Sequence, residues 1–278
     1  MDNMTATTTA TKQYVFSFQE GDGHDKKLLG GKGANLCEMT QIGLNVPPGF
    51  VISTEACLAY LETPQRLLPE GLIDDVKQQI SDLEKSTGKG FGDPDNSLLL
   101  SVRSGSALSM PGMMDTILNL GLNSDTLAGL IQQTANERFG YDAYRRFIQL
   151  FGKVALGIAD EKFDEPFEAL KQREGVKADL GLTAEHLHEI SEVFLDVVQE
   201  ETGRPFPTDV IDQLEISVKA VFNSWMGKRA IDYRNEFNIT SEMANGTAVN
   251  VMTMVFGNMG SDSATGVGFT RNPGTGEN

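Results

Sequence analysis

The fold of this chain is restricted most by one long helical stretch that lies between strand-forming regions. Apolar residues recur at helical spacing from about 124 to 201. Runs rich in β-branched and aromatic residues predict strands before it, at 50–52 and 98–102, and after it, at 248–256 and 266–270. We interpret the pattern as an α+β protein in which the helical stretch is an inserted subdomain.

The composition shifts along the chain predict four parts. A polar, threonine-rich start predicts a flexible tail at 1–12, and a region with glycine-rich loops follows at 13–123. The helical subdomain is expected at 124–207. A return helix and further strand-forming runs occupy 208–278.

Composition and charge exclude several classes of function. The 278 residues are 40% hydrophobic and 22% charged, which is typical of a globular chain. The formal net charge of −16 argues against a partner that is a nucleic acid or an anionic membrane. No apolar run is long enough to span a membrane. Two cysteines are too few for a disulfide framework, and the start of the chain lacks a secretory signal, so we expect a cytoplasmic protein.

Lys32 lies within a glycine cluster at residues 30–33 that we expect at the start of a helix. Free backbone N–H groups, the positive end of the helix dipole and a cation would together bind an anion there. The cluster is not a Walker A loop, because Gly33 stands where Ser or Thr should be. The alternative is that the glycines only permit a tight turn and Lys32 is a solvated surface charge.

Arg103 follows a buried strand and opens a connection at 103–116 before the next strand. Loops of this length inside compact domains are usually functional or disordered. A guanidinium at the carboxyl end of a strand is well placed to bind phosphate oxygens. The alternative is a salt bridge to one of the 39 acidic residues. The methionines of this loop either pack internally or form an apolar wall for a flat base.

Other kinds of catalytic site find little support in the residues. His186 and His188 are two positions apart on an expected helix, so they point to different faces and cannot share a metal well. Solvated or capping roles are expected for them instead. Cys37 is interpreted as a small buried hydrophobe. No histidine is paired with a suitable acid or thiol for acyl, hydride or metal-hydrolase chemistry.

Five motifs occur in a characteristic order. They are LLGGKGANL at 28–36, PPGF at 47–50, SVRSGSALSMPGMMDTILNLG at 101–121, GTAVNVMTMVFGN at 246–258 and GFTRNP at 268–273. This combination resembles the amino-terminal nucleotide-binding domain of the pyruvate, phosphate dikinase family. The related phosphoenolpyruvate synthases and glucan or water dikinases lack the MPGMMDT run, so the resemblance favours the pyruvate, phosphate dikinase branch.

The resemblance implies an ATP-grasp-like nucleotide-binding fold, here truncated, with 208–278 containing the start of its second half. It implies a phosphotransferase that uses ATP and Mg²⁺. The family transfers phosphoryl groups from ATP to a histidine on a separate swivelling domain and then to pyruvate, giving phosphoenolpyruvate, AMP and pyrophosphate. Lys32 and Arg103 would bind the phosphates and act in catalysis. The residues expected to contact the nucleotide are Gly30, Gly31, Lys32, Gly33, Arg103, Ser104, Gly105, Met113 and Arg271.

The same resemblance implies elements that do not occur in these 278 residues. The family's metal ligands would lie beyond Asn278, as would the phosphohistidine domain and the pyruvate-binding barrel, which are the expected partners. The chain alone is therefore predicted to be inactive. A homo-oligomer of the parent enzyme and an organelle signal at its carboxyl terminus remain open. The alternatives are a non-catalytic interaction module with the nucleotide fold, or a phosphoenolpyruvate synthase-type relative.

Overall fold

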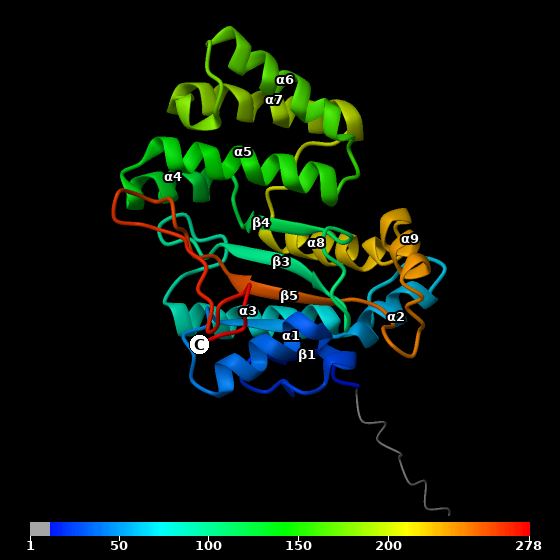
Figure 1. Ribbon diagram of the computed structural model, residues 1–278. Coiled ribbons are helices and arrows are strands. Elements are labelled where there is room, and N and C mark those ends of the chain that lie inside the picture. The colour runs from blue at the N-terminus through cyan, green and yellow to red at the C-terminus, as the bar shows by residue number, and fades with distance from the viewer. Residues whose placement is uncertain (1–11) are drawn as a thin grey trace, which may run out of the picture. The chain divides into compact units, whose positions relative to one another are not determined.

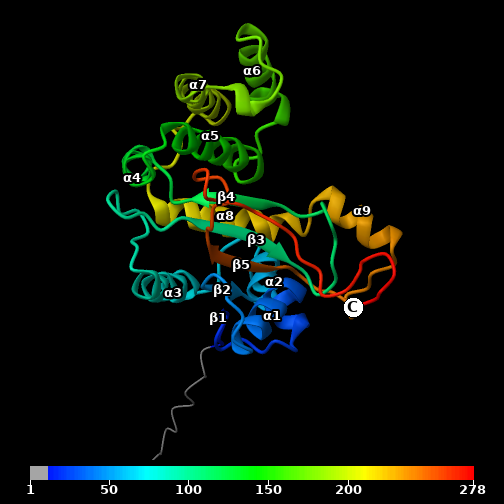
Figure 2. The same cartoon turned by 60° about the vertical axis from the view of Figure 1, so that its left-hand side comes forward.

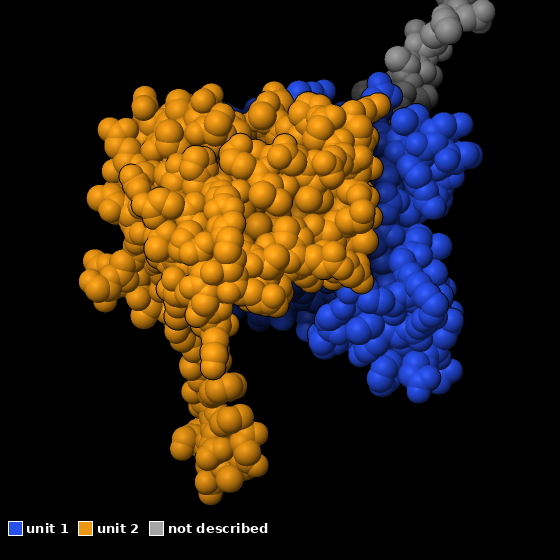
Figure 3. Space-filling view, turned by 90° about the horizontal axis from the view of Figure 1, so that it is seen from above, with its two compact units in different colours: residues 1–88, 101–117, 215–252 blue, residues 89–100, 118–214, 253–278 orange. Residues whose placement is uncertain are grey.

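The computed structural model describes residues 12–278, so the tail expected at 1–12 lies, apart from Lys12, outside the described residues. The chain divides into two compact units (Figure 3). The first unit comprises residues 1–88, 101–117 and 215–252, and the second comprises 89–100, 118–214 and 253–278. Each unit is thus assembled from separate segments of the chain.

Five strands form one sheet in which the strand order differs from the order in the sequence (Figure 1). They are β1 Val15–Ser17, β2 Gly49–Ile52, β3 Leu100–Gly105, β4 Thr116–Leu120 and β5 Ala248–Thr253. Their order is β1-β2-β5-β3-β4, and β2 pairs antiparallel with both β1 and β5. A strand from near the end of the sequence therefore occupies the middle of the sheet.

Helix α1, Lys26–Gln41, begins one turn before the glycines rather than at them. The side chain of Asp25 caps it by accepting a 2.9 Å hydrogen bond from the Leu28 N–H. Gly30 has φ 68° and ψ 161°, which breaks the helix into two segments. Our expectation that the glycines begin the helix holds only for the second segment, which restarts at Gly31.

The remaining helices that contribute to the first unit are α2 Thr54–Glu62, α3 Leu72–Thr87, α8 Val210–Ser224 and α9 Lys228–Glu236, and α8 begins in the second unit. Helix α1 packs on β2 and α2, and α3 packs on β1 and β2 (Figure 2). A core cluster beneath α1 contains Phe18, Leu29, Ala34, Cys37, Val51 and Ala248. The expectation that Cys37 is a small buried hydrophobe agrees with this packing, and burial raises the pKa of its thiol to about 11.

The second unit contains the helices expected between 124 and 201. They are α4 Ser124–Thr134, α5 Glu137–Val154, α6 Asp160–Arg173, the short 3₁₀ helix η1 Asp179–Gly181 and α7 Ala184–Thr202. Edge-to-face aromatic pairs link their apolar faces, as in Phe163 against Phe194 with ring centroids 5.1 Å apart. His186 has the capping role that was expected as one alternative, since it completes the capping box of Thr183 at the start of α7.

Two expected strands differ from the structure. The strand expected at 248–256 ends at Thr253, and residues 266–270 form no strand. Val267 and Phe269 are 82% and 68% exposed. Glycines at 266 and 268 carry no side chain to pack, and such positions weaken a strand that has no partner. Across residues 12–278 no helix is both long and apolar enough to cross a membrane.

Candidate functional site

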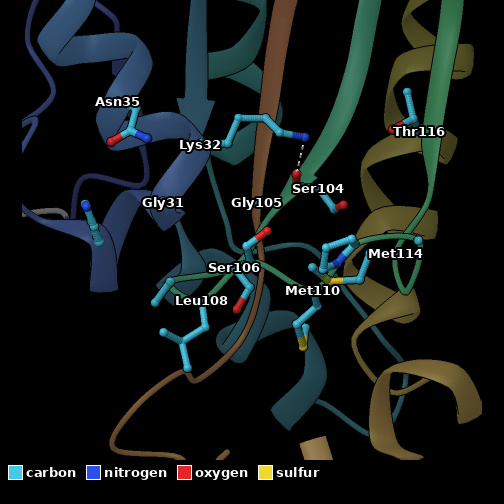
Figure 4. A pocket seen from close by; sticks show the side chains of 15 residues that line it. Gly31, Lys32, Asn35, Ser104, Gly105, Ser106, Leu108, Met110, Met114 and Thr116 are labelled. Carbon is cyan, nitrogen blue, oxygen red and sulfur yellow. Dashed lines mark hydrogen bonds between the residues drawn. The ribbon is translucent and has the colours of Figure 1, made fainter. Parts of the chain in front are cut away.

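A cavity of about 640 Å³ lies in the first unit between α1 and the loop that joins β3 to β4 (Figure 4). Four of the residues expected at the site line it, namely Gly31, Lys32, Ser104 and Gly105. None of its lining residues is acidic. In a chain with a net charge of −16, an acid-free cavity that contains lysines is suited to an anion.

The break at Gly30 brings α1 against the end of β3. A Cβ atom at Gly30 would lie 1.9 Å from the carbonyl oxygen of Gly105, so only glycine allows this approach. The Gly31 N–H donates a 2.8 Å hydrogen bond to the carbonyl of Ser106. The expectation of free N–H groups is therefore wrong for Gly31, because this group already ties the helix to the loop.

Lys32 points from α1 toward the end of β3, where its Nζ donates a 3.1 Å hydrogen bond to the carbonyl of Ser104 (Figure 4). Burial, and secondarily the charge of Arg103, lower the pKa of the Lys32 amine. Within residues 12–278 no carboxylate lies within ion-pair distance of Lys32. An incoming anion would relieve both effects that disfavour the charged amine.

Arg103 lies inside β3 rather than after it, because the strand continues to Gly105. This corrects the expected position at the opening of a loop. The guanidinium is half-buried, and its Nε is buried without a hydrogen-bond partner. No salt bridge joins Arg103 to a carboxylate in the described part of the chain, so the alternative of a structural ion pair finds no support.

The loop from Ser106 to Asp115 forms the other wall of the cavity. Ser106 is 5% exposed, and its Oγ has no hydrogen-bond partner although the residue lines the cavity. Met110 and Met114 also line the cavity, whereas Met113, the methionine expected at the site, does not. At the far end of the loop, Asp115 accepts a 2.9 Å ion-paired hydrogen bond from Arg229 of α9.

Three further expected residues have other positions. Gly30 and Gly33 support the turn but do not line the cavity. A Cβ atom at Gly33 would lie 2.9 Å from Oδ1 of Asn250, so this glycine is required for packing. Arg271 belongs to the second unit, where its guanidinium donates a 3.3 Å hydrogen bond to the carbonyl of Gly276.

Lys26 lines the cavity and was not recognised in the sequence. Its position at the start of α1 could have identified it. A cation is unfavourable at the positive end of a helix dipole, so a lysine there suggests a role other than helix stability. Among residues 12–278, no group of three or more His, Cys, Asp or Glu side chains could hold a metal ion.

Comparison with known proteins identifies the family. The model of the AMP/ATP-binding domain of pyruvate phosphate dikinase matches residues 26–74 and 64–278. The chain belongs to this family. The resemblance carried by the five motifs is thereby confirmed, and the mixed architecture with an open sheet is consistent with this nucleotide-binding domain.

Relatives from distant organisms support the same assignment. The chain is 58% identical over 266 residues to the pyruvate, phosphate dikinase of Entamoeba histolytica, covering 96% of the chain and 30% of the relative. It is 54% identical over 275 residues to the chloroplastic enzyme of Mesembryanthemum crystallinum, covering 98% and 28%. It is 52% identical over 271 residues to pyruvate, phosphate dikinase 2 of Zea mays, covering 96% and 30%. The chain thus spans less than a third of the length of these curated relatives.

Proposed function

We propose that this chain is the ATP-binding part of a pyruvate, phosphate dikinase. The full protein would transfer phosphoryl groups from ATP to a histidine on a separate domain and then to pyruvate, giving phosphoenolpyruvate, AMP and pyrophosphate. The family match and the relatives named pyruvate, phosphate dikinase support this reaction. The two buried cysteines without a disulfide support a reducing, cytoplasmic location.

One observation carries the proposed binding role. Lys32 lines the cavity, and Arg103, which does not line it, lies close enough for its charge to act on the Lys32 amine. Neither has a carboxylate partner among the described residues, in a chain where acidic residues outnumber basic ones by 39 to 23. Two neighbouring cations that repel each other are stabilised by an anion bound between them. A triphosphate is such an anion, and Arg103 can contact two of its oxygens through its planar guanidinium.

The other polar groups of the cavity fit the same ligand. The buried Ser106 hydroxyl lines the cavity and lacks a partner, and a phosphate oxygen would accept a hydrogen bond from it. Lys26 would add a third positive charge at the rim. Met110 and Met114 would provide the apolar wall for the base, and we retain Met113 and Arg271 as further nucleotide contacts in the full enzyme.

The cavity does not fit Mg²⁺ by itself. Magnesium prefers carboxylate, phosphate and water oxygens, and no acidic side chain lines this cavity. We propose that Mg²⁺ arrives with the nucleotide phosphates and that its protein ligands belong to the part of the family's domain that would follow Asn278. For the same reason we propose that these 278 residues alone have no dikinase turnover.

The proposal also covers the wider architecture. An ATP-grasp-like fold with a helical subdomain at 124–207 inserted between 13–123 and 208–278 would agree with the resemblance. The phosphohistidine domain and the pyruvate-binding barrel would be the partners of this chain.

The test is substitution of the two cations in the full-length enzyme. Charge-assisted hydrogen bonds contribute about 1.5–3 kcal/mol each, so Lys32→Ala or Arg103→Ala should slow ATP-dependent phosphorylation at least about tenfold. Lys27→Ala is the matched control, because this lysine lies on the same helix but does not line the cavity. Wild-type rates for both site variants would refute the assignment.

A further inference from the structure

Two buried polar residues of the first unit contact the backbone of β3 next to the cavity. Thr247, directly before β5, and Asn250, within β5, are 0% and 1% exposed. Neither lines the cavity, and neither is expected from the motifs of the glycine turn or the β3–β4 loop. Both side chains form hydrogen bonds with the backbone of β3 close to Lys32.

Thr247 holds the last residue of β3. Its Oγ1 accepts a 3.2 Å hydrogen bond from the N–H of Gly105. Gly105 is buried, so this N–H has no access to water as an alternative partner. Loss of the hydroxyl would leave the N–H unpaired and allow the end of β3 to move.

Asn250 fills a space that two glycines leave open. Its Nδ2 donates a 3.3 Å hydrogen bond to the carbonyl of Arg103. A Cβ atom at Gly105 would lie 2.6 Å from Nδ2, and one at Gly33 would lie 2.9 Å from Oδ1. The amide thus packs between the glycine turn of α1 and the end of β3, and it sets the distance between them.

The result is a segment, 103–105, in which three successive residues are held by side chains from elsewhere. Asn250 binds the carbonyl of Arg103, Lys32 binds the carbonyl of Ser104, and Thr247 binds the N–H of Gly105. We propose that Thr247 and Asn250 are positioning residues that keep Lys32 and Arg103 at the spacing the ATP phosphates require. This rests on the proposed function, in which these two cations bind those phosphates.

A purely structural role would make a different prediction. Ser101, further from the cavity on β3, donates a 3.3 Å hydrogen bond to the carbonyl of Met252 on β5. It therefore joins β3 to β5 through a side-chain hydrogen bond that does not involve segment 103–105. If these bonds only stabilise the sheet, removing either one should lower the stability of the protein and should leave KM for ATP unchanged.

The experiment compares isosteric and conservative variants in the full-length enzyme. Thr247→Val keeps the shape of the side chain but removes the acceptor, and it should raise KM for ATP about tenfold. Thr247→Ser keeps the hydroxyl, and its KM should stay within about twofold of wild type. Ser101→Ala should leave KM for ATP unchanged. Exchange between pyruvate and phosphoenolpyruvate, which does not use ATP, should be normal in every variant.

Asn250→Leu provides a second measurement if Thr247→Val folds poorly. The leucine has a similar size and no charge, but it cannot donate to the Arg103 carbonyl, and KM for ATP should again rise about tenfold. Equal KM values for wild type, Thr247→Val and Asn250→Leu would overturn the positioning role, even if Lys32→Ala abolishes ATP use. A normal rate for Lys32→Ala would instead overturn the proposed function itself.

Discussion

The break in α1 at Gly30 allows a stability prediction with a matched control. Gly30 has a positive φ of 68°, and Gly43, just after the same helix, has a positive φ of 84°. A Cβ atom at Gly43 meets nothing within 4 Å, whereas one at Gly30 lies 1.9 Å from a backbone oxygen of Gly105. Alanine at these two positions therefore separates backbone strain from steric overlap.

The magnitudes follow from these two terms. A non-glycine residue at a positive φ costs about 1–3 kcal/mol. This cost applies to both variants and lies at the upper end for Gly30→Ala, because a ψ of 161° puts Gly30 in a region essentially restricted to glycine. At Gly30 the oxygen must also move by about 1.5 Å to reach an ordinary contact of 3.4 Å, and such overpacking costs a further 1–3 kcal/mol or so. We expect Gly30→Ala to destabilise the first unit by about 2–6 kcal/mol.

Tryptophan fluorescence can measure this difference directly. The chain has one tryptophan, Trp225, which lies in the first unit and is 5% exposed. Its emission therefore reports unfolding of the unit that contains both glycines. Urea titrations should show a clearly lower midpoint for Gly30→Ala than for Gly43→Ala. Coincident midpoints would refute the reasoning, because they would show that β3 yields to the added methyl group without cost.

Two other perturbations have defined outcomes. ATP affinity, followed by calorimetry, should fall as pH rises through the lowered pKa of Lys32, because the neutral amine no longer attracts phosphate; a flat profile up to the pKa of an ordinary lysine would contradict this. Asp142→Asn should destabilise the second unit by up to about 3–5 kcal/mol, because it removes the nearer of the two carboxylates paired with the buried Arg145 guanidinium and leaves only that of Asp179, 3.4 Å away. An unchanged protection of α5 in hydrogen exchange would show that the pair contributes little.

The parts of the site that depend on local signals could be predicted from the sequence. A lysine among glycines at 30–33 and an arginine at the end of an apolar run indicate an anion site without knowledge of the fold. The structure places Lys32 close enough to Arg103 for their charges to interact. The predicted end of β3 was wrong, because the extension of this strand to Gly105 depends on contacts with residues far along the chain.

The long-range contacts had no local signal. Asn250 binds the carbonyl of a residue 147 positions earlier, and in the sequence it only disturbs the apolar pattern of a strand. Conversely, the alternation of apolar residues at 266–270 predicts a strand, but a strand forms only where a partner strand is available to pair with it. The described residues contain no partner for this segment, and it forms no strand. Periodicity reports which faces of a segment are apolar, but pairing is decided by the tertiary fold.

The central position of β5 also determines when the site can form during synthesis. Strands β2 and β3 emerge early from the ribosome, but the strand between them follows β2 by about 200 residues, so the sheet closes late. Until then the inner edges of β2 and β3 lack their native partner, and such edges can pair with other chains. The surplus of negative charge in the sequence opposes such pairing between copies by mutual repulsion until β5 joins the sheet.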